Sequence, residues 1–259
     1  MVQPKKKLGQ HFLVHDSIAE RIASAMENNH FPILEIGPGE GKLTQFILEK
    51  YKSQAFAVEI DEESIPHLHQ RFPEMTDRII FGDFLKLDLT EIFPDKFNII
   101  GNFPYNISSQ ILFKVLEHRH CVPQVIGMFQ KEVADRVIAP PGSKTYGILS
   151  VLIQAYYNTQ YLFTVLPGSF YPPPKVKSGV IKLVRNDREN LNCDELMFFK
   201  VVKLAFNQRR KTLRNSLKSL LTSELGKEEI FNLRPEQLSP DDFERICLMI
   251  EVDQKNAGL

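Results

Sequence analysis

The sequence predicts an α/β protein with a Rossmann-like, mostly parallel sheet and a small all-helical domain after it. Short apolar runs alternate with helical stretches between residues 33 and 129, which is the pattern of strand–helix–strand units. The run at 55–61 is apolar almost to its end, as expected for a strand that is buried on both faces. Strand-like runs cease after a polar stretch at 185–190, which indicates a linker and a second domain.

The elements of the first domain follow from apolar spacing and from turn residues. A first helix begins at Asp16 or Ser17 and ends before Phe31 and Pro32. Strands are then expected at 33–36, 55–61, 78–81, 97–100 and 124–129, and helices at 42–51, 62–72, 108–116, 131–138 and 148–156. Strands at 161–166 and 180–184 have no helix between them, which predicts an antiparallel pair at the sheet edge.

The boundary between the domains is expected at residue 187. Residues 1–187 are then the cofactor-binding domain, and residues 188–259 are a helical domain. Helices are expected there at 195–206, 209–221, 228–233 and 240–250. Ser239 followed by Pro240 is a typical helix start.

Composition excludes several classes of protein. Lysine and arginine together number 32, as do aspartate and glutamate, so overall charge does not indicate an acidic partner. Cys121, Cys193 and Cys247 are far apart and lack a CxxC spacing, so we expect neither a disulfide framework nor a metal site, in a reduced, cytoplasmic protein. No apolar run approaches the roughly 20 residues that span a bilayer, and the basic N-terminus lacks a signal-peptide core.

A glycine-rich turn follows the first predicted strand of the sheet. Gly37, Gly39 and Gly41 allow a ligand to lie against the backbone at the carboxyl end of the sheet. Lys42 stands where the dinucleotide-binding fingerprint has its third glycine. The turn therefore favours a nucleoside-type cofactor over a pyrophosphate, and a purely structural turn is the alternative.

Polar residues end the next three strands. A carboxylate at Glu59 can accept both hydroxyl hydrogens of a ribose, and Asp83 can accept from an adenine amine. The alternative for either acid is a helix N-cap. The ends of four consecutive strands thus carry glycines, Glu59, Asp83 and Asn102, in that order. This order is expected for the binding of S-adenosylmethionine in a Rossmann-like methyltransferase.

The segment Asn102-Phe103-Pro104-Tyr105 suits a flat, nitrogen-rich ligand. Its amide oxygen can accept from an exocyclic amine, and its aromatic ring can stack on a base. A strand-to-helix turn with a capping asparagine and a core tyrosine is the alternative.

A basic segment spans residues 200–218 and contains no acid. Its basic residues are Lys200, Lys203, Arg209, Arg210, Lys211, Arg214 and Lys218. In a continuous helix, Arg210, Arg214 and Lys218 would form one stripe, which favours contact with RNA phosphates. A solvated face is the alternative, and Lys5, Lys6 and Lys7 are either a mobile basic arm or a disordered tail.

Five motifs together resemble the ribosomal RNA small-subunit adenine dimethyltransferase family over essentially the whole chain. They are Gln10-His11-Phe12-Leu13, Glu35-Ile36-Gly37-Pro38-Gly39-Glu40-Gly41, Asn102-Phe103-Pro104-Tyr105-Asn106-Ile107-Ser108, Pro172-Pro173-Pro174-Lys175-Val176 and Phe206-Asn207-Gln208-Arg209-Arg210-Lys211-Thr212. The resemblance implies an S-adenosylmethionine-dependent enzyme with a role in ribosome biogenesis. It would dimethylate N6 of two adjacent adenosines near the 3′ end of 16S ribosomal RNA, in the immature 30S subunit. We expect it to be a monomer that does not associate with a membrane.

The resemblance also implies roles for individual residues. The cofactor contacts would be His11, Leu13, Gly37, Glu59, Asp83 and Asn102. The catalytic site would comprise Asn102, Pro104, Tyr105 and Phe170, of which the last closes the far face of the base. The RNA contacts would include Arg209, Arg210, Lys211 and Arg214. The position of His11 is often asparagine in the family, and a histidine there would bind the cofactor carboxylate in a pH-dependent way.

Three other functions compete with this one. The same chemistry could act on large-subunit ribosomal RNA, although the Phe206–Thr212 motif favours the small subunit. A non-catalytic RNA-binding assembly factor could use the same fold, but the complete set of strand-end residues opposes a loss of catalysis. A nicotinamide-dependent oxidoreductase is disfavoured by Lys42 and by the absence of a Tyr-x-x-x-Lys or histidine-based hydride site.

Overall fold

The computed structural model describes residues 3–27 and 30–257, which form two compact units. The first, here the sheet unit, joins the chain up to Ala134 to Asn158–Arg185, and the second, the helical unit, joins Asp135–Tyr157 to the chain from Asn186. The boundary expected at residue 187 is close to the last crossing between the units, at Arg185. Residues 135–157 nevertheless belong to the helical unit, so residues 1–187 do not form one continuous body. The outer ends of the expected domains, residues 1 and 259, lie outside the described residues.

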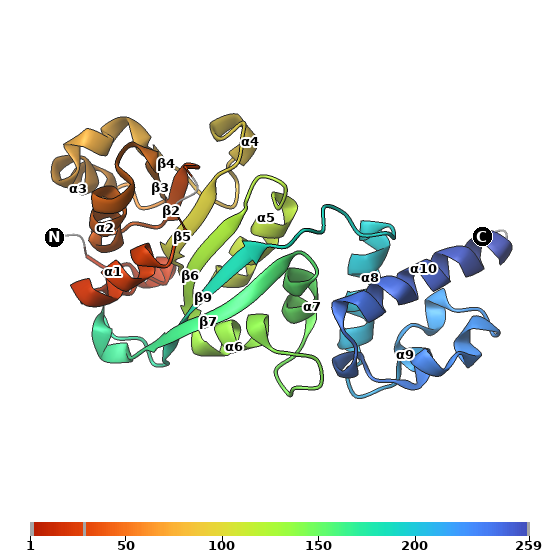
Figure 1. The fold of residues 1–259 in the computed structure, drawn as a ribbon. Helices are drawn as coiled ribbons and strands as arrows, with labels where there is room; N and C mark the ends of the chain where they lie inside the picture. The colour runs from red at the N-terminus through yellow and green to blue at the C-terminus, as the bar shows by residue number, and fades with distance from the viewer. Residues whose placement is uncertain (1–2, 28–29, 258–259) are drawn as a thin grey trace. The chain divides into compact units, whose positions relative to one another are not determined.

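The sheet has seven strands among the described residues, in the order β4-β3-β2-β5-β6-β9-β7 (Figure 1). They are β2 (Ile33–Ile36), β3 (Ala55–Glu59), β4 (Ile79–Phe81), β5 (Asn98–Asn102), β6 (Gln124–Gln130), β7 (Tyr157–Val165) and β9 (Ser178–Arg185). The first five in this order are parallel, and β9 is antiparallel to β6. The predicted fold class is therefore confirmed.

The strand order creates a crevice between β2 and β5. The chain adds β3 and β4 on one side of β2, and then returns to add β5 and β6 on the other. Ligands bind at such a switch point, at the carboxyl ends of the strands. The registers Ile33↔Asn98 and Glu35↔Ile100 bring the turn after Ile36 beside Asn102.

Helices of the sheet unit bury the apolar faces that the sequence predicts. They are α1 (Asp16–Ser24), α2 (Lys42–Tyr51), α3 (Ser64–Arg71), α4 (Leu89–Ile92) and α5 (Ser108–Glu117), and α6 (Lys131–Ile138) leads into the helical unit. α1 packs on α2, which buries Leu43 and Ile47. The Tyr51 hydroxyl bonds to the carbonyl oxygens of Ala23 and Met26, at 3.0 and 2.9 Å.

A two-stranded sheet joins the N-terminal segment to the loop after β7. β1 (Phe12–Leu13) pairs antiparallel with β8 (Phe170–Tyr171), with Phe12 opposite Tyr171 and Leu13 opposite Phe170. Residues directly opposite each other share a face of a sheet. Leu13 and Phe170 enter the core cluster, and Tyr171 is exposed.

The helical unit is built from α7 (Ile148–Gln154), α8 (Glu195–Asn207), α9 (Leu213–Ser216), α10 (Pro240–Ala257) and short 3₁₀ turns. α7 contacts both α8 and α10, and it buries Leu152 and Ile153 completely. This packing explains why residues 135–157 belong with the C-terminal helices.

The continuous helix predicted at 209–221 is wrong. α8 ends at Asn207, Thr212 is extended (φ −70°, ψ 157°), and α9 is followed by a 3₁₀ turn at Lys218–Leu220. The Leu213 N–H bonds to the carbonyl oxygen of Leu233, at 2.9 Å, instead of to a preceding turn. Arg210, Arg214 and Lys218 therefore do not form a helical stripe, although Leu213, Leu217 and Leu220 of the same segment are buried.

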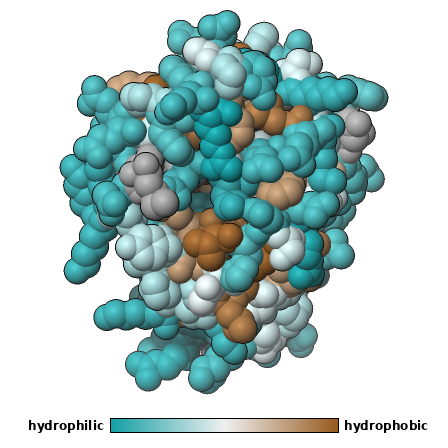
Figure 2. Space-filling model, turned by 90° about the vertical axis from the view of Figure 1, so that its left-hand side faces the viewer, coloured by the Kyte–Doolittle hydropathy of each residue, from teal (hydrophilic) through white to brown (hydrophobic). Residues whose placement is uncertain are grey.

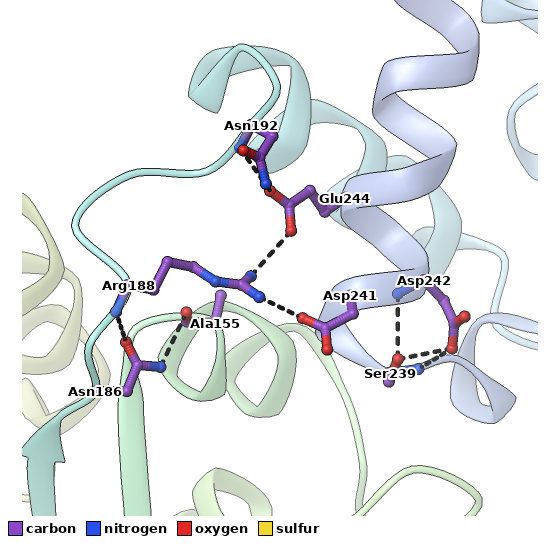
Figure 3. A network of polar contacts seen from close by, with 8 residues as sticks. All are labelled: Ala155, Asn186, Arg188, Asn192, Ser239, Asp241, Asp242 and Glu244. Carbon is purple, nitrogen blue, oxygen red and sulfur yellow. Dashed lines mark hydrogen bonds and ion pairs between the residues drawn. The ribbon is translucent and has the colours of Figure 1, made fainter.

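The linker after β9 is fastened to the start of α10 (Figure 3). The Arg188 guanidinium lies 2.5 Å from an Asp241 carboxylate oxygen and 3.1 Å from one of Glu244. Asn192 donates to Glu244 from both its backbone and its side chain, at 2.5 and 2.9 Å. Ser239 and Asp242 bond reciprocally at the helix start. The polar stretch expected to be a linker is thus ordered against α10.

Apolar surface remains on the sheet unit. Its exposed large apolar side chains are Val14, Ile60, Phe81, Leu166, Tyr171 and Val176. Figure 2 shows one face of the molecule, on which hydrophobic residues gather near the middle among hydrophilic ones. Apolar side chains therefore make up part of this exposed face.

Candidate active site

A cleft lies in the sheet unit at the carboxyl ends of β2, β3, β4 and β5. It encloses about 660 Å³, open solvent included. It brings together residues that the sequence analysis singled out, among them His11, Gly37, Gly39, Glu59, Asp83, Asn102, Pro104 and Tyr105. Residues that pattern reasoning did not assign also line it, among them Gly9, Gln10, Phe12 and Phe84.

The glycine turn requires glycine at its tip. Gly37 and Gly39 have φ values of 68° and 57°, in the left-handed region that favours glycine. A Cβ atom on Gly39 would lie 2.7 Å from the Phe12 ring. The turn therefore keeps its backbone close to the cleft and packs against the N-terminal segment.

Glu59 is buried at the end of β3, with 2% of its surface exposed. Its Oε2 accepts from the Gly39 N–H at 2.9 Å, and its Oε1 accepts from the Asp61 N–H at 2.8 Å. Burial raises the pKa of Glu59, and these backbone hydrogen bonds oppose the rise. Each carboxyl oxygen retains a second acceptor direction, so the group can bind a pair of hydroxyls.

A second buried acid, Glu35, supports the turn from behind. The Thr44 hydroxyl of α2 donates to its Oε2 at 2.6 Å. Burial raises the pKa of Glu35 to about 8, and the nearby Glu59 adds to the rise. Glu35 is therefore mainly neutral at pH 7. An acid inside the apolar strand Ile33–Ile36 was the available sequence signal.

Asp83 and Phe84 occupy the loop after β4. Asp83 Oδ1 accepts from the Leu85 N–H at 3.0 Å, and Asp83 Oδ2 lies 3.8 Å from the Lys86 ammonium. The Phe84 side chain is 3% exposed and lines the cleft. Asp83 thus bonds within its own loop and also lines the cleft. It is not the helix N-cap of the alternative interpretation, because the residues that follow it form a turn and α4 has Asp88 as its N-cap.

Asn102 is the last residue of β5 and is held in a defined orientation. Its Nδ2 donates to the carbonyl oxygen of His11 at 2.8 Å. Within the described part of the chain, no hydrogen bond engages its Oδ1. The amide therefore presents an acceptor for a ligand in the cleft.

His11 bridges the N-terminal segment and the loop after β8. Its Nδ1 lies 2.7 Å from the carbonyl oxygen of Pro172. A carbonyl oxygen can only accept, so Nδ1 carries the hydrogen, and the neutral ring has a bare Nε2. In this tautomer Nε2 can only accept, so it cannot donate to a carboxylate.

Tyr105 stands beside His11, with ring centroids 5.4 Å apart and an interplanar angle of 31°. Its hydroxyl lies 2.5 Å from Ser178 Oγ. Burial raises the pKa of Tyr105, so the phenol stays protonated. The ring is therefore a neutral, anchored surface in the cleft.

Two predicted residues do not line the cleft. Leu13 and Phe170 are 5% and 4% exposed and pack in the core. Their shared face of the β1–β8 sheet points away from the face of Phe12, because side chains alternate along a strand.

The N-terminal segment is clamped over the cleft by charges that the sequence analysis did not pair. Lys5 Nζ lies 2.6 Å from an Asp61 oxygen and 3.0 Å from one of Glu63, and Gln10 donates to Asp61 at 3.2 Å. Burial opposes ionisation of Asp61, but the bonds from Lys5 and Gln10 hold its pKa below the usual range. Lys5 is therefore not part of a free basic arm, whereas Lys6 and Lys7 are exposed.

The predicted RNA-contacting residues lie in the helical unit. Arg209 donates to the Ser143 carbonyl oxygen at 3.2 Å and lies 3.9 Å from Glu236. Arg214 donates to the Gly226 carbonyl oxygen at 2.6 Å and is exposed, as are Arg210 and Lys211.

No group of three or more His, Cys, Asp or Glu side chains within residues 3–27 and 30–257 could hold a metal ion. In the same ranges, the structure contains no helix with the length and apolar character needed to cross a bilayer.

Comparisons with known proteins agree with the geometry. A family model described as "Ribosomal RNA adenine dimethylase" matches residues 1–250. Ribosomal RNA small subunit methyltransferase A of Parabacteroides distasonis is 55% identical over 266 residues, which cover 100% of this chain and 98% of that relative. The protein of the same description from Cytophaga hutchinsonii is 56% identical over 245 residues, covering 93% and 95%.

Solved structures share the fold. A dimethyladenosine transferase from Plasmodium falciparum superimposes with a TM-score of 0.78 at 24% identity, covering 96% of this chain and 99% of that one. The 23S rRNA methyltransferase ErmE gives 0.69 at 24% identity, covering 93% and 99%. The resemblance found from the motifs is confirmed, and the chain belongs to the ribosomal RNA adenine dimethylase family, as an RNA methyltransferase with the class I methyltransferase fold.

Proposed function

We propose that the protein places two methyl groups on N6 of each of two adjacent adenosines near the 3′ end of 16S ribosomal RNA. S-adenosylmethionine is the proposed donor, the immature 30S subunit is the proposed substrate, and ribosome biogenesis is the process served. The family and the small-subunit relatives that match the whole chain support this assignment. We further propose that the protein is a cytoplasmic monomer.

The cleft fits the proposed donor. Gly37 and Gly39 leave the backbone accessible, Glu59 offers acceptors for a ribose diol, and Asp83 offers one for an exocyclic amine. When bound, S-adenosylmethionine supplies an electrophilic methyl group on a sulfonium. His11 and Leu13 complete the proposed cofactor contacts, although the Leu13 side chain is buried.

The orientation of Asn102 is the observation that carries the proposal. The lone pair of an adenine N6 is delocalised into the ring, and the base must leave its stack to be reached. Asn102 Oδ1 accepts one N6 hydrogen, and a backbone carbonyl at Phe103 or Pro104 accepts the other. Both bonds favour a tetrahedral nitrogen, whose lone pair then points at the electrophile. The bond from Asn102 Nδ2 to His11 prevents the amide from turning its donor toward the base.

Positioning supplies most of the remaining catalysis, because no strong base is needed to remove the proton from the methylated amine. Tyr105 stacks on the target base, and its bond to Ser178 holds the ring in place. Phe170 is proposed to cover the other face of the base. It would have to leave its packing against Leu13 to do so.

The helical unit is proposed to bind RNA phosphates. Arg210, Lys211 and Arg214 are exposed and can approach a phosphate backbone directly. Arg209 belongs to the same proposed set, and it also holds the loop at Ser143. Phosphate neutralisation releases counterions, so this binding should weaken steeply as salt rises.

The decisive experiment is methyl transfer to immature small subunits, with the modified positions mapped by primer extension. We expect stops at two adjacent adenosines near the 3′ end of the 16S RNA. Modification of large-subunit RNA alone would instead assign the rival substrate. Absence of transfer to either RNA, with RNA binding intact, would indicate a non-catalytic assembly factor.

A further inference from the structure

Lys114 is a buried lysine that the proposed mechanism does not use. It lies on α5, the helix that follows the Asn102–Tyr105 segment, and only 8% of its surface is exposed. Its ammonium donates to the carbonyl oxygens of Leu85, at 3.1 Å, and Leu87, at 2.5 Å. The same nitrogen lies 5.5 Å from the centroid of the Phe84 ring.

A lysine at this place is costly. Burial lowers the pKa of Lys114, which shows that the protein environment disfavours its charge. An apolar side chain of similar length could fill the same space without that penalty. The ammonium therefore has a role other than packing. Its contacts indicate that role, because it donates to two carbonyl groups of one loop.

That loop lines the end of the cleft where the adenine of the proposed cofactor would bind. It begins at Asp83 and Phe84, which both line the cleft. The loop follows β4, the edge strand of the sheet, so the sheet supports it from one side only. Internal bonds from the N–H groups of Lys86 and Leu87 to the Asp83 carbonyl give it a local shape but do not anchor it to β5 or α5.

We propose that Lys114 is a positioning residue for the cofactor's nucleobase. It fastens the 83–88 loop to α5, so that Asp83 and Phe84 keep the geometry that selects a purine with an exocyclic amine. Because α5 also follows the Asn102–Tyr105 segment, the same contact ties the nucleobase end of the cleft to the acceptor end. The inference rests on the proposed use of S-adenosylmethionine.

Calorimetry with two ligands tests the role without relying on turnover. The ligands are S-adenosylhomocysteine and its inosine analogue, which carries an oxygen in place of the amine. The variants are Lys114→Met, which keeps the stem, and Lys114→Arg, which keeps charge and donors. Lys86→Met is the matched control, because Lys86 belongs to the same loop, its side chain is 84% exposed, and its closest acid lies 3.8 Å away.

We expect the wild-type protein to prefer the adenine ligand by about tenfold, the value of one good hydrogen bond. Lys114→Met should bind the adenine ligand about tenfold more weakly and lose most of this preference. Lys114→Arg and Lys86→Met should retain it. A folded Lys114→Met with wild-type affinity and preference would overturn the proposal.

Two further outcomes are informative. If Lys114→Met does not fold, Lys114→Leu takes its place, because it also lacks a donor, and an unchanged preference in that folded variant would equally refute the role. If the wild-type protein fails to bind S-adenosylhomocysteine, the proposed methyl-transfer function fails, and the role of Lys114 fails with it. If the wild type binds and the folded Lys114→Met, or its replacement, keeps an unchanged preference, the Lys114 proposal alone is rejected.

Discussion

The sheet unit and the helical unit hold the residues of their proposed sites in different ways. In the cleft, each polar group is fixed by a partner: Glu59 by the Gly39 N–H and Asn102 by the His11 carbonyl. In the helical unit, Arg210 and Lys211 are exposed on the turn between α8 and α9. The first arrangement is suited to a defined geometry at one atom. The second is suited to summed charge, whose effect depends little on exact orientation.

The largest effect is expected at Asn102, on the rate of methyl transfer, and it tests the defined geometry of the cleft. Asn102→Ala removes the acceptor for the N6 hydrogen and should lower the methyl-transfer rate by about 100-fold or more, as for loss of a preorganised polar contact. RNA affinity, measured by filter binding, should stay within about twofold of wild type, which is a change below 1 kcal/mol. Turnover close to wild type would remove Asn102 from the reaction.

The reverse pattern is expected from the basic turn. The triple variant Arg210→Ala, Lys211→Ala and Arg214→Ala should weaken RNA binding and flatten its salt dependence by about 2 in log–log slope. The cofactor-product affinity should not change, because these residues do not line the cleft. Lys50→Ala and Lys52→Ala, at exposed lysines of the sheet unit, provide the control. An unchanged slope would make the basic turn only a solvated surface.

A third prediction concerns Glu35, the buried acid next to the glycine turn of the cleft. The folded-state pKa of Glu35 is about 8, whereas an exposed glutamate titrates near ~4.3. The unfolded chain thus releases this proton at lower pH than the folded chain. The contribution of Glu35 to the free energy of unfolding is fully present below pH ~4.3 and is lost as pH rises toward 8.

Glu35→Gln cannot titrate and should escape that loss. Relative to wild type, its free energy of unfolding should rise by roughly 2–3 kcal/mol between pH ~5 and pH ~7. Urea denaturation across this range measures the difference. Glu62→Gln, at an exposed position, is the control. Parallel pH profiles for Glu35→Gln and wild type would contradict the assigned protonation state.

The smallest effect is expected at the Tyr105 hydroxyl. Tyr105→Phe keeps the stacking ring and loses only the bond to Ser178, which costs about 1 kcal/mol. The KM for RNA should therefore rise only a few-fold, by about fivefold at most for that energy. Tyr105→Ala, which removes the ring, should impair the reaction far more. Equal rates for the two variants would show that the ring does not stack on the base.

Strand ends could be predicted from the sequence alone, together with the residues that stand on them. Apolar runs closed by glycine or an acid are local signals, and parallel strands bring their carboxyl ends to one edge. Gly37, Glu59, Asp83 and Asn102 therefore converge as expected. The five motifs also sufficed to identify the family, because they occur in order over essentially the whole chain.

Tertiary structure alone decided the contacts between distant segments. The pairing of β1 with β8, the ion pair of Lys5 with Asp61 and the anchoring of a loop by Lys114 have no periodic signal. The basic stripe failed as a prediction because burial of Leu213, Leu217 and Leu220 is compatible both with a continuous helix and with the broken one observed. The extended Thr212 and the bond from the Leu213 N–H to the Leu233 carbonyl oxygen mark the break. Local patterns determine which residues can be buried, whereas long-range hydrogen bonds determine where the chain turns.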